Sequence, residues 1–273
     1  MKKVLDICIC SAVVVSEALS GTAHAACSST APSTGTGVVC TGTGILPVAA
    51  VPGSSAVTIG IDSTVAAGLT RASSPVAFSV GRASTIANSG ALTFSGGGGS
   101  GTNRGAVLLG TGDTNQLTNT SVGKIITTGA FSDGMAANGS GNTLINNGSI
   151  ATSGPNAYGM TAAWGQTNVG QLNNTLVNTG SVTTSGSNAR AASIIGGSGT
   201  INNSGSLSTS GANSPTAYLQ GNNDSLVNTG TITATGTDSD AVFSNTAGSS
   251  FTATIENRAG GQIFSQSGAA VRT

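Results

Sequence analysis

Apolar and polar residues alternate in a short segment that recurs along the chain. In Leu226–Gly236, every second residue is apolar, Asn or small, and four of the five residues between them are threonines. Because successive residues of a β-strand face opposite sides, this alternation predicts strands with one buried and one polar face. The same pattern, with the same parity, occurs in four further segments: Ile86–Gly96, Leu144–Gly154, Leu176–Gly186 and Ile201–Gly211. Two looser copies contain insertions: Leu117–Gly129 and Ile255–Gly268.

Each copy has an asparagine at its third position. The seven asparagines are Asn88, Asn119, Asn146, Asn178, Asn203, Asn228 and Asn257. Their spacing of 25 to 32 residues suits one supersecondary unit per repeat, with insertions absorbed in loops. A second apolar segment, such as Ala157–Met160 or Ala217–Leu219, follows the motif, so each repeat predicts about three short strands around one coil.

The asparagines are predicted to be structural residues. In a stack of coils, equivalent side chains lie about 4.8 Å apart, and their amides can form a hydrogen-bonded ladder. Asparagine also tolerates the left-handed backbone of a turn. The glycine two residues later allows either a positive φ or a close approach of neighbouring coils.

These features together predict an all-β parallel β-helix, or β-solenoid. Residues 1–25 are assigned to a signal peptide, 26–80 to an N-terminal cap with irregular first coils, and 81–273 to regular coils. Terminal coils expose unpaired strand edges, and Cys27–Pro52 is expected to cover one of them. No final polar closing unit follows Val271, so an open or truncated C-terminal end is also expected.

The N-terminus has the features of an export signal. Lys2 and Lys3 precede the largely apolar segment Val4–Val15, and Ala23-His24-Ala25 provides a site for cleavage before Ala26. Of the two cysteines that remain, Cys27 and Cys40 are expected to form one disulfide in an exported protein. Lipidation of Cys27 and a metal site are weaker alternatives.

The composition argues against an ordinary globular enzyme and against electrostatic binding of nucleic acid. Charged residues make up 7% of the chain and the net charge is zero, whereas about a quarter of globular protein residues are charged. The only histidine, His24, precedes the predicted cleavage site, which excludes Ser–His–Asp sites from the exported part. We therefore expect no catalytic, cofactor-binding or metal site.

A few residues remain candidates for chemistry or contact. Asp238 and Asp240 share one loop and could act as an acid–base pair on sugars, although a solvated loop is the simpler interpretation. Tyr158 and Tyr218 follow small residues, are predicted to occupy matching repeat positions and are expected to stack on one face. Trp164, in the insertion Thr161–Gln171, is the candidate contact residue, with a half-buried loop tryptophan as the alternative.

The repeats resemble those of autotransporter passenger domains, the adhesin-like products of type V secretion in Gram-negative bacteria. The resemblance rests on the copies of N-x-G-x-[ILV]-x-x-[ST]-G, on Ile255–Ile263 and on Ala26–Gly42, and it covers nearly the whole exported chain. It implies a right-handed parallel β-helix displayed at the cell surface. It also implies a membrane-embedded C-terminal barrel, which these 273 residues do not contain.

Three functions are compatible with this sequence. The first is a non-catalytic structural or adhesive stalk, exported to the cell surface, that contacts a host or neighbouring cell. The second is a polysaccharide-active enzyme that uses Asp238 and Asp240. The third is a truncated passenger without a function of its own.

Overall fold

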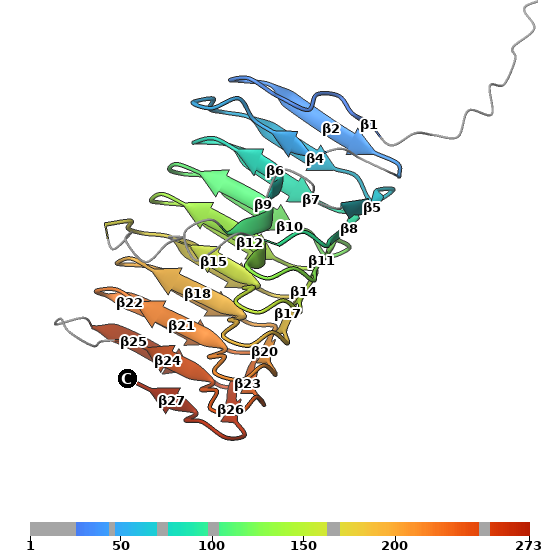
Figure 1. Cartoon of the computed structure of the whole chain (residues 1–273). Coiled ribbons are helices and arrows are strands. Elements are labelled where there is room, and N and C mark those ends of the chain that lie inside the picture. Colours follow the sequence, from blue (N-terminus) through green and yellow to red (C-terminus); the bar gives the residue numbers. More distant parts are fainter. Residues whose placement is uncertain (1–25, 44–46, 70–75, 98–103, 163–169, 246–251) are drawn as a thin grey trace, which may run out of the picture.

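The chain winds into a rod of stacked β-coils (Figure 1). The structure, a computed structural model, describes residues 26–43, 47–69, 76–97, 104–162, 170–245 and 252–273. None of these residues lies in a helix, and the strands form three sheets that run the length of the rod. The predicted all-β β-solenoid with three strands per coil is therefore confirmed.

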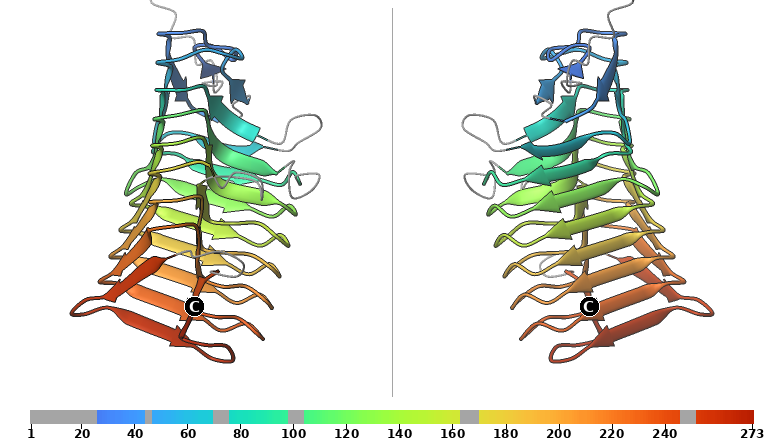
Figure 2. Two further views of the ribbon diagram at one scale, coloured as in Figure 1. Left: turned by 90° about the vertical axis from the view of Figure 1, so that its left-hand side faces the viewer. Right: turned by 90° about the vertical axis from the view of Figure 1, so that its right-hand side faces the viewer.

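Each full coil contributes one strand to each sheet, and Figure 2 shows the coils stacked along one axis. The first sheet has the order β1 (Ala26–Cys27), β2 (Gly37–Thr41), β4 (Thr58–Ile61), β7 (Thr85–Asn88), β10 (Gln116–Asn119), β13 (Thr143–Asn146), β16 (Thr175–Asn178), β19 (Thr200–Asn203), β22 (Asp224–Asn228) and β25 (Ala253–Asn257). The second sheet contains β5 (Ala66–Leu69), β8 (Ala91–Phe94), β11 (Lys124–Thr127), β14 (Ser149–Thr152), β17 (Ser181–Thr184), β20 (Ser206–Thr209), β23 (Thr231–Ala234) and β26 (Gln262–Ser265). The third sheet contains β3 (Val48–Ala49), β6 (Val76–Val80), β9 (Gly105–Thr111), β12 (Ser132–Asn138), β15 (Met160–Ala162), β18 (Ala192–Ile195), β21 (Ala217–Gln220), β24 (Val242–Ser244) and β27 (Val271–Arg272).

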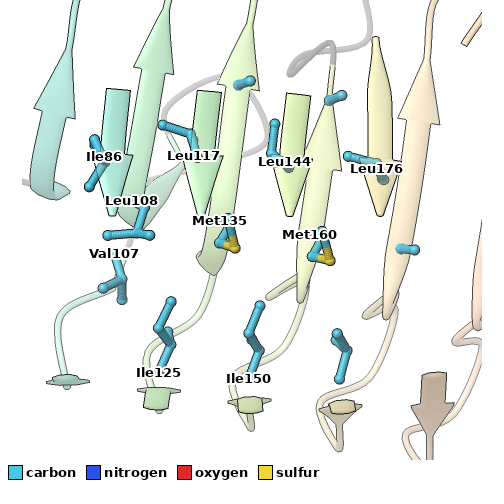
Figure 3. Close-up of a cluster of buried hydrophobic side chains, with 14 of the residues drawn as sticks. Ile86, Val107, Leu108, Leu117, Ile125, Met135, Leu144, Ile150, Met160 and Leu176 are labelled. Atoms are coloured by element: carbon cyan, nitrogen blue, oxygen red, sulfur yellow. The ribbon is translucent and has the colours of Figure 1, made fainter. Parts of the chain in front are cut away.

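The core consists of columns of equivalent apolar side chains. In the first sheet, Leu144 pairs in register with Leu176, which in turn pairs with Ile201. Met135 and Met160 form part of a corresponding column in the third sheet (Figure 3). All five side chains are fully or almost fully buried. Burial of one such side chain stabilises a fold by about 1.5–3 kcal/mol, so the stacking of coils supplies most of the driving force.

The seven motif asparagines form a column, of which the six from Asn88 to Asn228 are buried in this core and the last, Asn257, is exposed. Each asparagine from Asn88 to Asn228 donates from Nδ2 to Oδ1 of the next asparagine along the rod, at 2.7–2.8 Å. From Asn119 onwards, the same Nδ2 groups also donate to a backbone carbonyl of the next coil, for example from Asn178 to Ser206 at 3.1 Å. The ladder therefore satisfies amides that would otherwise be costly to bury.

The expected left-handed turn is not at these asparagines. None of the seven has a positive φ; they end the strands of the first sheet in extended conformation. Positive φ angles occur instead in turns, both before the first sheet, as at Thr114, Ser198 and Asn223, and before the third sheet, at Asn156, Asn188, Asn213 and Asp238. The motif asparagine is selected by its amide, which bonds along the stack, and not by its backbone preference.

The glycine after each asparagine is required by close packing between coils. Gly180, Gly205 and Gly230 have no positive φ, but a Cβ atom at any of them would collide with a carbonyl oxygen one coil earlier. Of the two reasons offered for this glycine, close approach is therefore the one that applies here. Any larger residue would push adjacent coils apart and lengthen the ladder hydrogen bonds.

The N-terminal edge of the first sheet is covered by β1, which pairs antiparallel to β2. Cys27 lies opposite Cys40 in this pair, and the two form a disulfide. The short hairpin thus places a covalent link at the edge strand of the rod, where unpaired backbone groups would otherwise favour association with other chains.

Replacing one ladder asparagine should destabilise the rod strongly. Asn203→Ala removes the acceptor of Asn178 and the donor to Asn228, so two buried polar groups each lose a partner. We expect the free energy of unfolding to fall by about 2–4 kcal/mol in urea titrations. The matched control is Asn202→Ala, on the opposite, partly exposed face of the same strand, with a change below about 0.5 kcal/mol. Equal effects of the two substitutions would contradict the ladder.

Candidate functional site

Arginine and aromatic side chains stack along the outer side of the third sheet. Arg190 lies over the Tyr218 ring, with its guanidinium carbon 3.4 Å from the ring centroid, and 5.0 Å from the centroid of Tyr158. Tyr218 meets Phe243 edge to face, and Arg272 lies 4.0 Å above Phe243. Tyr218 belongs to a cluster separate from the main core, whereas its strand neighbours Ala217 and Leu219 belong to that core. We call Arg104, Tyr158, Arg190, Tyr218, Phe243 and Arg272 the Arg–aromatic stack.

The expectation that Tyr158 and Tyr218 occupy matching repeat positions is wrong. Met160 pairs with Ala192, and Ala192 pairs with Ala217, so the residue equivalent to Tyr158 is Pro215. The two tyrosines nevertheless share one face, because Arg190 lies between them. Tyr158 lies twelve residues after Asn146, whereas Tyr218 lies fifteen residues after Asn203, so this difference is already visible in the sequence.

A buried ion pair anchors the N-terminal part of the stack. Arg104 donates from Nε to Oδ2 of Asp133 at 2.8 Å and also contacts Oδ1, and both side chains are almost fully buried. Burial raises the pKa of Asp133, while Arg104 and the backbone N–H of Tyr158 oppose that rise. Both carboxylate oxygens of Asp133 accept hydrogen bonds from Arg104, and Oδ1 also accepts one from the backbone N–H of Tyr158, so the pair holds the turn that carries Tyr158.

A pocket of about 290 Å³ opens at the C-terminal part of the stack. Its lining combines two arginines, two aspartates, two aromatic residues, an asparagine and a proline: Arg190, Asn213, Pro215, Tyr218, Asp238, Asp240, Phe243 and Arg272. Four successive coils supply these residues, which are far apart in sequence. Asn213 and Asp238 have φ angles of 53° and 52° at equivalent turns, so the backbone selects short polar residues at this rim.

The two aspartates proposed for acid–base chemistry both line this pocket, but they differ in environment. Asp240 is 5% exposed, and its Oδ2 accepts an ion-pair contact from Nε of Arg272 at 2.7 Å. Its Oδ1 accepts a hydrogen bond from the backbone N–H of Ala269 at 2.8 Å. Asp238 is exposed, and its carboxylate has no partner among the described residues. Only Asp238 therefore has both carboxylate oxygens available to a ligand.

Arg190 is the unpaired cation of the pocket. One of its terminal nitrogens donates to Oγ of Ser193 at 3.2 Å, and its plane is held on Tyr218. It forms no salt bridge with a carboxylate in the described part of the chain. The scattered arginines of the sequence thus gave no sign of this group, because register between coils is what brings Arg190 to the pocket.

Other sequence candidates lie outside the described residues or are not assembled into a site. Trp164, His24 and the predicted signal peptide are outside the described residues. Within the described ranges, no group of three or more His, Cys, Asp or Glu residues is placed to hold a metal ion. The same part of the chain contains no helix long and apolar enough to span a membrane.

A second polar column lies four residues before the asparagine ladder. Asn142 accepts from the backbone N–H of Asn115 at 2.8 Å, and Asn174 accepts from that of Asn142 at 2.9 Å. Likewise, Oδ1 of Asp224 accepts a hydrogen bond from the backbone N–H of Gly199 at 2.8 Å. The repeated spacing of four residues between polar positions is visible in the sequence and could have predicted this column.

Asp224 is an isolated buried carboxyl group. It is 1% exposed, and its Oδ2 has no hydrogen-bond partner. Burial raises the pKa of Asp224 to about 6, partly opposed by the hydrogen bond from Gly199. It does not line the pocket, and no cation among the described residues forms a salt bridge with it. The raised pKa makes this group a source of pH-dependent stability.

Comparisons with known proteins found no similar family, protein or fold. No family model matched the chain, and neither did any curated protein or any solved structure.

Removal of the Asp224 charge should stabilise the rod at neutral pH. The folded pKa of about 6 exceeds the reference value of 3.8, so the folded state binds this proton more tightly. The stability that this proton contributes is complete below pH 3.8 and is lost as pH rises through 6. Asp224→Asn should raise the unfolding free energy at pH 7.5 by about 1–3 kcal/mol, with the difference shrinking towards pH 4.

The control for this prediction is Asp238→Asn, which changes an exposed carboxylate. Urea titrations of wild type and both variants between pH 4 and pH 8 provide the measurement. A pH-independent difference between Asp224→Asn and wild type would show that Asp224 does not carry the expected proton.

Proposed function

We propose that the chain is a non-catalytic structural and adhesive passenger of an autotransporter-like protein, exported and exposed at the cell surface. The observation that carries this proposal is the unbroken register of stacked coils from β4 to β27, which builds a stiff rod from short repeats. A rod of this kind holds a contact surface away from the point of attachment. The repeat resemblance to passenger domains supports the same assignment.

The outward faces of the rod favour contact over chemistry. In the second sheet, Ser181, Thr183, Ser206 and Thr231 project outward as exposed or partly exposed hydroxyl groups on successive coils. Short hydroxyl side chains lose little conformational entropy on binding and can donate or accept hydrogen bonds. Such faces suit adhesion to a host or neighbouring cell through many weak contacts.

A polysaccharide-active enzyme is the second candidate, because Asp238 and Asp240 line one pocket. Its weakness is Asp240, whose two oxygens are occupied by Arg272 and by the backbone of Ala269. A general acid or base must be free to exchange a proton with the substrate. A panel of polysaccharides incubated with wild type and Asp240→Asn decides the matter: cleavage lost in the variant would establish the enzyme and overturn the non-catalytic assignment.

Adhesion can be tested by display on a non-adherent Gram-negative bacterium. Fusion of the chain to an outer-membrane barrel should increase attachment to epithelial monolayers or sister cells several-fold over the barrel alone. Deletion of residues 59–85 removes one coil that contributes nothing to the pocket and keeps register, because Thr58 pairs with Thr85 and Ile59 with Ile86. This shortened rod should retain most of the attachment.

A fusion that reaches the surface and attaches no better than the barrel alone would contradict the adhesive function. Surface exposure is checked with an antibody to the rod, so failure of export is separated from failure of adhesion. Attachment that disappears on loss of one coil would instead place the function in that coil and not in a general stalk.

A further inference from the structure

We propose that the pocket beside the Arg–aromatic stack binds a sugar residue that bears a carboxylate, such as a uronic acid within a glycan. The inference deepens the proposed adhesive function and rests on it, since it names the chemistry that the rod would recognise on another surface. Four steps lead to this ligand: the free cation, the free acceptors, the net charge of the lining and the size of the pocket.

The free cation of the pocket is Arg190. Stacking on Tyr218 at 3.4 Å and the bond to Ser193 fix the plane of its guanidinium. An arginine held in one plane presents parallel N–H groups that match the two oxygens of a carboxylate. Because Arg190 has no salt bridge in the described structure, a ligand carboxylate would not have to displace a protein one.

The free acceptors lie at the rim of the same pocket. The Asp238 carboxylate and the Asn213 amide are exposed at equivalent turns of adjacent coils. Carboxylate and amide oxygens accept hydrogen bonds from hydroxyl groups. A ligand that satisfies both ends of the pocket therefore carries a carboxylate near Arg190 and hydroxyl groups near Asp238, which is the pattern of a sugar acid.

The charge of the pocket lining disfavours ligands that carry more than one negative charge. Two arginines and two aspartates give a net charge of zero, and Asp240 already neutralises Arg272. Near Arg190, a phosphate dianion would be repelled by Asp238 and Asp240 about twice as strongly as a single carboxylate, so the lining favours the ligand with one negative charge.

Size and shape limit the ligand to about one sugar residue. The volume of about 290 Å³ lies at the lower limit of small-molecule pockets. Tyr218 is 4% exposed, so its ring supports Arg190 and does not stack on the ligand. The apolar surface that a sugar ring could contact is provided by Pro215 and Phe243, which are partly exposed.

The test is an NMR titration of the isotope-labelled full chain with sodium glucuronate, glucose, acetate and inorganic phosphate. We expect glucuronate to shift the Arg190 Nε–H and Asn213 side-chain signals in a saturable manner. Glucose, acetate and phosphate should each bind at least tenfold more weakly. Equal binding of acetate or phosphate, or the absence of shifts at these residues, would overturn the proposal.

Two variants separate the roles of the charges. Arg190→Gln should remove the preference for glucuronate over glucose, while Asp238→Asn should keep the preference and weaken glucuronate binding a few-fold. Asparagine already occupies the equivalent turn position at Asn156, Asn188 and Asn213, so Asp238→Asn preserves the backbone. An Arg190→Gln variant that folds and retains the preference would also overturn the proposal. If that variant does not fold, the wild-type titration decides alone.

Failure of this inference is distinguishable from failure of the adhesive function. Cells that display the rod and attach normally, with no glucuronate binding by the purified chain, would leave adhesion intact and remove only the sugar-acid pocket. The converse result, glucuronate binding without attachment, would leave the pocket and remove the adhesive role.

Discussion

The structure depends on hydrogen bonds between asparagine side chains that are buried inside the rod. Stacked apolar columns supply attraction but discriminate weakly between one register and another, because Leu, Ile and Val can replace each other in contact. A buried amide discriminates strongly, since it loses free energy unless its partner lies directly above it. The column from Asn88 to Asn257 therefore fixes which residue of each coil lies over which residue of the next.

Fixed register has consequences at the surface, far from the ladder itself. Once the coils are aligned, the residues that lead into the third sheet also form columns, and Arg190 is brought between Tyr158 and Tyr218. The pocket beside them collects side chains from four coils. A protein with few charged residues can in this way concentrate two arginines and two aspartates at one place, because each coil needs to supply only one or two of them.

The sequence predicts the interior of this protein better than its exterior. The parity of Leu226, Asn228 and Ile232 was enough to predict which side chains are buried, because a slip by one residue would expose all of them. The conformation of the turns is harder to predict from the sequence. Left-handed residues include Asn188, Asn213 and Asp238 but none of the ladder asparagines, and short polar side chains suit both roles. The Arg–aromatic stack joins residues at different positions of successive coils, so no sequence period connects Tyr158 to Tyr218.

The most direct test of the ladder is hydrogen exchange of the asparagine side-chain amides, followed by NMR on the intact chain. The amides of Asn119, Asn146, Asn178 and Asn203 should exchange as slowly as the backbone amides of the core strands, because they open only when coils separate. The side-chain amide of Asn202, on the outer face, should exchange at the rate of a free amide. If the ladder asparagines exchange as fast as Asn202, their side chains are not joined in a buried column, and the account is wrong.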